Sequence, residues 1–458
     1  MKIRKINVSE IDGFKLGNAE NTEKGTGCTV IICEDGAVGG VDVRGGAPAT
    51  RETDLLRSEN TVDAVNAVVL SGGSAFGLES ACGVMNELSE RGVGFKLGDI
   101  CVPIVCGASL FDLAVGDSKS YPDKDMGRQA CRNAYENLFS NGNSGAGTGA
   151  SVGKLHGMNR AMKTGLGTFA CADDKLQVGA IVAVNAVGDI YNGAGNIIAG
   201  LRTEEGSEIY GTIKSLKPMV HDNASSSEGG EEVKEKPRAF AEINDDKVKT
   251  KSEIAAAIRN AFSNKAKNKV VEENVEKAKA EESIPNDNST ASIVDFYSSD
   301  EMIFSEDKNE ASEAVAAVNE EQSINENEAL VTENKSTDIE AENKYSDTAD
   351  DNAYQDPDKG YDIPFNTTVA CLITNAKLSK SQCNKLASVL HDAYARSIKP
   401  VHTTMDGDTV FVLTTGKQEV NFDAFAALAT DVLQYAIIDG AMSAKAAYGL
   451  PSTSDIIR

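Results

Sequence analysis

Residues 204–362 form a long segment whose composition cannot support a hydrophobic core. The segment is rich in Glu, Asn, Ser, Lys, Asp and Ala and poor in aromatic residues. It buries too little apolar area to offset the conformational entropy lost on folding, so we predict that it is largely disordered, with at most a frayed helix around residues 251–280. The apolar blocks on either side, residues 1–203 and 363–458, are then expected to form one domain.

Most of the negative charge of the chain lies in this acidic segment. The net charge is −25, and residues 201–360 carry 38 Asp and Glu against 19 Lys and Arg. Nucleic acids and anionic membranes bind clustered Lys and Arg, so we expect neither as a partner. No stretch approaches the ~18 apolar residues of a membrane helix, and Met1–Asn7 is not followed by a signal-peptide core. These features predict a cytoplasmic protein.

The nine cysteines stand singly in apolar runs, with no C-x-x-C pair and an odd total. This usage is typical of buried, reduced thiols in a cytosolic protein. The sequence contains neither an H-E-x-x-H motif nor a Cys/His grouping of the kind that binds zinc, so we expect no metal and no cofactor.

Short apolar runs on both sides of the acidic segment predict a layered α/β fold. Alternation and β-branched residues predict strands over residues 28–33, 40–44, 178–185, 367–374 and 409–414. Helices are predicted from Ser74 to Arg91, stopped by Gly92, from a capping box that opens at Ser379, and from Asn421 to Asp439.

Three glycine-containing motifs suggest chemistry that their context does not support. Gly145–Ala150 matches the dinucleotide fingerprint G-x-G-x-x-A but follows no clear strand, so tight backbone packing is the favoured interpretation. A P-loop ending at Gly153-Lys154 lacks its first glycine and has Leu155 in place of Ser or Thr. Around Ser74 a nucleophile elbow fails because Phe76 occupies its last glycine position, which favours a turn that enters a helix.

Several polar residues have both a structural and a catalytic interpretation. Their spacing along the sequence does not decide between the two. Asp406-Gly407-Asp408 is either a plain turn or a pair of carboxylates that orient a nucleophile. Lys154 either reaches solvent or supplies a cation beside the nucleophile, and Asn185 either caps a turn or donates to an oxyanion. The four histidines leave few candidates for the base of a Ser-His-Asp triad.

The dipeptide Asn366-Thr367 opens the apolar run that follows the acidic segment. If the bond between these two residues is cut, Thr367 becomes an N-terminal nucleophile. Its freed α-amine, with a reference pKa near ~8, is suited to accept the hydroxyl proton around neutral pH.

Six motifs, in order along the chain, resemble those of the DmpA-type aminopeptidases, peptidase family S58. This family includes L-aminopeptidase/D-esterases, β-peptidyl aminopeptidases and nylon-oligomer hydrolases. The resemblance covers about residues 1–205 and 361–455. The motifs are Arg44–Asp54, Leu70–Leu78, Phe111-Asp112-Leu113, Gly147–Ala150, Asn366-Thr367-Thr368 and Asp406–Phe411.

The resemblance implies a four-layer αββα sandwich, as in ornithine acetyltransferases, and self-cleavage into an α chain, residues 1–366, and a β chain, residues 367–458. It makes Thr367 the nucleophile, with Asp406, Asp408, Asn185 and Lys154 beside it. Phe111 stands where some relatives carry a tyrosine, so a phenolic hydroxyl is absent. The implied substrate-binding residues are Phe111, Gly147, Thr148 and Gly149.

The resemblance therefore implies an aminopeptidase that acts on small peptides, amides or esters, assembled as a homo-oligomer of αβ heterodimers. The alternatives are acyl transfer of the ornithine acetyltransferase type and endo-type hydrolysis of amide oligomers. A third is a non-enzymatic scaffold whose acidic segment recruits a basic partner. The acidic segment itself is longer than in most relatives and lies at the end of the implied α chain, where an exposed connection tolerates insertion.

Overall fold

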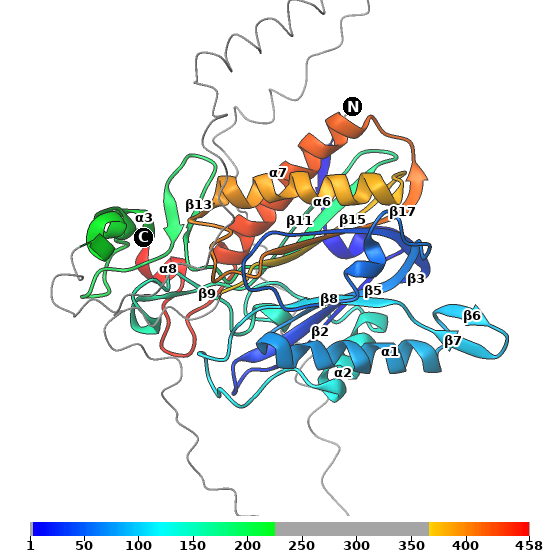
Figure 1. The fold of residues 1–458 in the computed structure, drawn as a ribbon, viewed down its shortest axis with the longest axis horizontal. Helices are drawn as coiled ribbons and strands as arrows, with labels where there is room; N and C mark the ends of the chain where they lie inside the picture. The colour runs from blue at the N-terminus through cyan, green and yellow to red at the C-terminus, as the bar shows by residue number, and fades with distance from the viewer. Residues whose placement is uncertain (1–2, 225–365, 458) are drawn as a thin grey trace, which may run out of the picture. The chain divides into compact units, whose positions relative to one another are not determined.

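The computed structural model describes residues 3–224 and 366–457 (Figure 1). Most of the segment predicted to be disordered, including the frayed helix around residues 251–280, lies outside these residues.

Ten strands in the described residues form one mixed sheet. Strands β15 (Val369–Ala376) and β17 (Thr409–Gln418) lie parallel in its middle, and β5 (Ala64–Ser71) and β8 (Val105–Ser109) form a second parallel pair. The order across the sheet is β1 (Arg4–Ile6), β11 (Leu166–Ala172), β12 (Gln177–Ala183), β15 (Val369–Ala376), β17 (Thr409–Gln418), β3 (Thr26–Val43), β5 (Ala64–Ser71), β8 (Val105–Ser109) and β4 (Thr50–Arg51), with β2 (Lys15–Asn21) also paired to β3. The predicted α/β class is confirmed.

The two strands predicted over residues 28–33 and 40–44 are one strand, β3. A shift in its register with β5 falls between Ile32 and Ala37, where Gly36 has a φ of +81°. The glycines between the two predicted strands therefore lie inside one strand. A Cβ on Gly40 would collide with the backbone of the helix that begins at Lys380, so glycine lets this helix pack closely on β3.

The predicted helices form, and the capping box predicted at Ser379 is confirmed. In α6 (Lys380–Ser397), Ser379 and Gln382 make the expected capping box, and α7 (Phe422–Met442) is capped by Asn421. A 3₁₀ turn, Ser74–Glu79, leads into α1 (Ser80–Glu90), which confirms the helix-entry interpretation of that motif. Helix α2 (Lys124–Tyr135), which we did not predict, begins at the N-cap Asp123.

Alternate residues of the strands contribute to different hydrophobic clusters. Leu372 of β15 packs in a cluster with α6 and α7, whereas its neighbours Cys371 and Ile373 belong to a second cluster. That second cluster also contains Ile31 of β3, whose neighbour Val30 packs with α1 and α2 in a third. Figure 1 shows α6 and α7 on one side of the strands and α1 and α2 on the other.

Helix α7 is long and apolar enough, by length and composition, to cross a membrane. The expectation that no stretch of the chain approaches the length of an apolar membrane helix was therefore wrong. Ten of its residues, including Phe425 and Leu433, are buried, and it packs against α6 and strands β11 and β12. These contacts are those of a core helix.

The structure describes ordered elements beyond residue 203, where the disordered segment was predicted to begin. Helix α3 (Thr212–Leu216) lies there and is followed by a 3₁₀ stretch, Lys217–Ala224. The buried Asp189, in β13 (Asp189–Tyr191), accepts hydrogen bonds from the N–H and Oγ1 of Thr212, both at 2.6 Å, and from the N–H of Leu201 at 2.8 Å. This carboxylate holds the start of α3 against β13, which pairs with other strands than those of the ten-stranded sheet.

Candidate active site

The predicted nucleophile, Thr367, and the predicted acidic pair, Asp406 and Asp408, lie side by side just before two neighbouring strands begin. Strands β15 and β17 are parallel, with Val369 opposite Thr409, and a bridge joins Asn366 to Asp406. Parallel neighbours begin at the same edge of a sheet, so this register places Thr367 beside Gly407. Residues 40 apart in sequence therefore meet at one edge.

The main-chain N–H of Gly407 donates to two oxygens of the Asn366-Thr367 dipeptide. It lies 3.1 Å from the carbonyl oxygen of Asn366 and 3.0 Å from Oγ1 of Thr367. The Thr367 hydroxyl itself donates to the Asn366 carbonyl oxygen, and the Thr367 N–H donates to the main-chain oxygen of Asn185 at 2.7 Å. Thr367 is only 4% exposed. The hydroxyl and the peptide bond before it are thus held together in a buried position.

Only one carboxylate oxygen of Asp406 accepts hydrogen bonds from the described residues. Its Oδ2 accepts from the N–H of Thr403 at 2.8 Å and from its hydroxyl at 2.6 Å, whereas Oδ1 has no hydrogen-bond partner among the described residues. Burial and the neighbouring Asp408 raise the pKa of Asp406 to about 6, against the opposing effects of Thr403 and Lys154. Asp406 is therefore able to exchange a proton near neutral pH.

Both carboxylate oxygens of Asp408 have hydrogen-bond partners. Its Oδ1 accepts from the N–H of Thr368 at 2.7 Å. Its Oδ2 lies 3.2 Å from the main-chain nitrogen and 2.9 Å from Nδ1 of His402. Asp408 thus joins Thr368, the residue after the predicted nucleophile, to a histidine that was not among the predicted site residues.

Lys154 and Asn185 meet in the interior. The Nζ of Lys154 donates to Oδ1 of Asn185 at 2.7 Å, and Nδ2 of Asn185 donates to the Phe111 carbonyl oxygen at 2.9 Å. Lys154 is 1% exposed, so the interpretation in which it reaches solvent was wrong. Burial lowers its pKa to about 7, although the nearby Asp406 and Asp112 favour its charged form.

Two further buried ionisable residues, Asp112 and Lys163, lie near this site, and neither was among the predicted site residues. Asp112 accepts from the N–H of Gly73 at 2.6 Å and from the hydroxyl of Thr26 at 2.8 Å, and burial raises its pKa to about 6. Burial lowers the pKa of Lys163 to about 7, which the charge of Asp112 partly offsets. Both residues stand in apolar or glycine-rich runs of the sequence, and this was the feature from which their burial could have been predicted.

The Gly147–Ala150 loop is fully buried, as the tight-packing interpretation of that motif requires. Nζ of Lys163 donates to the carbonyl oxygens of Gly147 at 2.9 Å and Ala150 at 3.1 Å, and also to that of Thr164. A Cβ on Gly149 would lie 2.6 Å from Cβ of Asp112, and the Thr148 hydroxyl donates to the Gly145 carbonyl oxygen at 2.7 Å. The substrate contacts predicted for Gly147, Thr148, Gly149 and Phe111 stay predictions.

The motif that begins at Arg44 forms a backbone cradle for the acidic pair. The N–H of Arg44 donates to the Asp408 carbonyl oxygen at 2.9 Å, and that of Ala47 donates to the Asp406 carbonyl oxygen at 2.8 Å. A Cβ on Gly45 would collide with the backbone of Asp406. Glycine at this position therefore allows the close approach that fixes the loop carrying both carboxylates.

Several proteins of known sequence are similar to this chain. An uncharacterised aminopeptidase of Mycobacterium bovis is 28% identical over 472 aligned residues, covering 98% of this chain and 97% of the relative. One from Mycobacterium leprae is 26% identical over 97% and 92%. A 6-aminohexanoate-oligomer endohydrolase of a Kocuria strain is 30% identical, but over only 42% of this chain and 51% of its own length.

Two solved structures share the fold. A β-aminopeptidase of a Burkholderia species superposes with a TM-score of 0.51 at 13% identity, over 98% of this chain and 91% of that structure. The L-aminopeptidase D-Ala-esterase/amidase of Ochrobactrum anthropi, described as a variant of the Ntn-hydrolase fold, has a TM-score of 0.50 at 12% identity, over 95% and 86%. At such identities the similarity establishes the fold alone.

A protein-family model matches both ends of the chain and leaves out much of the acidic segment between them. The model of peptidase family S58 matches residues 7–217 and 301–453. The first range extends past residue 203 and includes α3. The resemblance noted from the six motifs is thereby confirmed, and the chain belongs to peptidase family S58.

Proposed function

We propose that the protein is a self-processing aminopeptidase whose nucleophile is Thr367. One observation carries the proposal: the N–H of Gly407 donates both to the Thr367 hydroxyl and to the oxygen of the Asn366 carbonyl group whose carbon this hydroxyl would attack. A donor at that carbonyl oxygen stabilises the negative charge that develops there during attack.

In the processing step, Oγ1 of Thr367 attacks the carbonyl carbon of Asn366. Its hydroxyl proton passes to the leaving nitrogen as the peptide bond breaks, which leaves an ester between Asn366 and Oγ1 of Thr367. Water hydrolyses this ester, giving a carboxylate on Asn366 and a free hydroxyl and amine on Thr367. The products are an α chain of residues 1–366 and a β chain of residues 367–458.

In the mature enzyme, the amine of Thr367 accepts the proton of its own hydroxyl as Oγ1 attacks a substrate carbonyl. Asp406 and Asp408 orient and stabilise the ammonium form, and Lys154 orients Asn185. The second amide hydrogen of Asn185 and the N–H of Gly407 are the donors that we assign to the oxyanion. The leaving amine takes the proton, and water releases the acyl group.

The wider architecture that we propose is a four-layer αββα sandwich, which the division of alternate strand residues among three hydrophobic clusters supports. We propose residues 1–203 and 363–458 as one catalytic domain, extended by the elements to residue 224. We also retain cytoplasmic location and assembly as a homo-oligomer of αβ heterodimers as proposals.

For the substrate, we propose small peptides, amides or esters with a free N-terminal amine, because the relatives that match over nearly the full chain are named aminopeptidases. Endo-type hydrolysis of amide oligomers is the second candidate, since the Kocuria relative carries that name.

Transfer of the acyl group to an amine is separated from hydrolysis by assaying an acyl donor with amino-acid acceptors.

A matched pair of substitutions tests the nucleophile. Thr367→Val keeps the shape of the side chain but removes the hydroxyl, so the purified full-length chain is expected to stay uncut on a denaturing gel. Thr368→Val is the control, because Oγ1 of Thr368 has no hydrogen-bond partner among the described residues. N-terminal sequencing of the smaller fragment of the unmodified protein is expected to begin at Thr367. A different start, or cleavage of the Thr367→Val protein, contradicts the proposal.

A further inference from the structure

His402 contacts the carboxylate that holds the backbone of the proposed nucleophile. Its main-chain N–H and its Nδ1 both point to Oδ2 of Asp408, at 3.2 and 2.9 Å. A carboxylate oxygen accepts hydrogen bonds, so the geometry of this pair fits the His402 tautomer that has its proton on Nδ1. With the N–H of Thr368 on Oδ1, three donors converge on Asp408.

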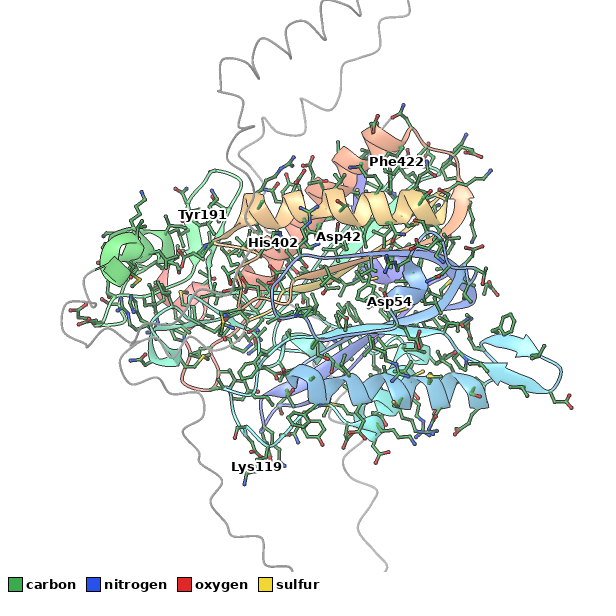
Figure 2. The ribbon with its side chains drawn as sticks, in the orientation of Figure 1. Asp42, Asp54, Lys119, Tyr191, His402 and Phe422 are labelled. Atoms are coloured by element: carbon green, nitrogen blue, oxygen red, sulfur yellow. The ribbon has the colours of Figure 1, made fainter. Side chains whose placement is uncertain are left out.

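The imidazole is packed on its other side by two residues of α6. His391 meets the His402 ring edge-on, with centroids 4.7 Å apart, and Tyr394 stacks on it at 5.9 Å. His391 is buried, and its Nε2 lies 3.2 Å from the Asp42 carbonyl oxygen. Figure 2 shows His402 and Asp42 on the side of the strands that α6 covers. The ring is therefore held in one orientation, with Nδ1 toward Asp408.

Nδ1 carries the only side-chain hydrogen bond of His402 within the described residues, because Nε2 is buried there without a partner. The main chain of His402 has a φ of +55°, which a non-glycine residue rarely adopts. A conformation of this kind persists only where the surrounding structure imposes it. Here it brings both donors of one residue onto the same carboxylate oxygen.

The Asp408–Thr368 hydrogen bond gains importance once the chain is cut. Before cleavage, the Asn366–Thr367 peptide bond holds Thr367 from its N-terminal side. Afterwards, Thr367 keeps its own contacts to Asn185 and Gly407 and the contact of the next residue to Asp408. A carboxylate free to rotate would let the new N-terminus move, and displacements of about 1 Å at a reacting group cost up to ~10²-fold in rate.

We propose that His402 is a positioning residue, which locks the carboxylate of Asp408 so that Asp408 fixes the Thr367-Thr368 backbone before and after cleavage. This inference rests on the proposed function of Thr367. His402 does not touch the substrate; it acts through Asp408.

Two substitutions separate the hydrogen bond from the backbone conformation. His402→Gly adopts a positive φ without strain but lacks the donor, whereas His402→Asn tolerates the same φ and places its Nδ2 near the position of Nδ1. In the full chain, His402→Gly is expected to slow self-cleavage and to lower kcat for aminoacyl p-nitroanilides by about tenfold or more, with KM within about twofold. His402→Asn is expected to recover most of both rates.

A spectroscopic measurement tests the contact without relying on activity. The chain has four histidines, so ¹⁵N-histidine spectra of the uncut Thr367→Val protein are assignable with the His402→Asn variant. We expect a proton on Nδ1 of His402, with a signal that shifts in Asp408→Asn. A ring protonated on Nε2 alone overturns the inference even if the Gly variant fails to fold.

The outcomes distinguish this inference from the proposed function. A His402→Gly protein as active as the unmodified one, or a His402→Asn protein no better than the Gly variant, overturns the role of His402 alone. Unmodified protein that neither cuts itself nor hydrolyses the p-nitroanilides overturns the proposed function, and the role of His402 falls with it.

Discussion

Gly407 and Thr367 are joined by a hydrogen bond of 3.0 Å from the main-chain N–H of Gly407 to Oγ1 of Thr367. The same N–H donates to the carbonyl oxygen of Asn366 at 3.1 Å. Both contacts follow from the parallel register of β15 and β17, because it sets the two residues opposite one another where the strands begin. One backbone donor thus serves both partners of the proposed cleavage reaction.

Gly407→Ala is expected to abolish or strongly slow self-cleavage. A Cβ at this position would lie 2.7 Å from Oγ1 of Thr367 and 2.7 Å from the carbonyl oxygen of Ala47, so the loop or the Thr367 side chain has to shift. We expect a loss of stability of about 1–3 kcal/mol, measured by urea denaturation, together with an uncut band on a gel. Gly193→Ala is the control, because a Cβ there meets nothing within 4 Å. Normal cleavage in Gly407→Ala would falsify the expected displacement, because alanine keeps the main-chain N–H and adds only the Cβ.

Lys154→Met is expected to slow self-cleavage by about 10²-fold. The substitution removes the donor to Oδ1 of Asn185 and the positive charge that lowers the pKa of Asp406. The pKa of Asp406 should therefore rise above about 6, and Asn185 should lose its orientation. The fraction of cut chain is followed over time on gels, with the exposed Lys417→Met as control. Equal rates in the two variants argue against a role for Lys154.

The stability of the uncut Thr367→Val protein is expected to rise with pH just above neutrality. The pKa of Lys163 is about 7 in the folded protein and near its ordinary value of 10.5 when unfolded, so the unfolded state binds more protons between these values. Each such lysine adds up to about 1.4 kcal/mol per pH unit to the unfolding free energy in this window. Lys154 acts in the same direction.

Lys163→Met tests this pH dependence. We expect the slope between about pH 7.5 and 8.5, from urea melts, to fall by up to about 1.4 kcal/mol per unit. The window stops there because buried thiols such as Cys106, with a pKa raised from 9.0 to about 12, have the opposite effect at higher pH. Lys119→Met, an exposed lysine on the loop labelled in Figure 2, should leave the slope unchanged. An unchanged slope in Lys163→Met contradicts the lowered pKa.

Asp189→Asn is expected to loosen the segment that ends in α3. The amide retains one acceptor oxygen but sets an N–H₂ group against the donors of Leu201 or Thr212, which costs about 1–3 kcal/mol. Hydrogen exchange of residues 200–216 should become faster, while that of β15 stays slow. Asp174→Asn, at an exposed turn position, is the matched control. Equal protection in both variants contradicts this role of Asp189.

The sequence alone determined the features that depend on neighbouring residues. The caps of α6 at Ser379 and of α7 at Asn421 involve side chains that bond to the backbone within one turn, and Gly92 ends the helix that contains α1. Strands β12, β15 and β17 were predictable because their apolar residues are contiguous or alternate. The family was predictable because its motifs recur in order.

The tertiary structure decided which polar groups meet and which charges are buried. That Lys154 is buried against Asn185, or that Asp112 and Lys163 lie near it, depends on contacts between segments far apart in the chain. The use of Gly40 in the middle of β3 likewise became visible only from the close packing of α6 against it. Local patterns carry no information on strand register, and the register of β15 with β17 places Thr367 against Gly407 and Thr368 against Asp408.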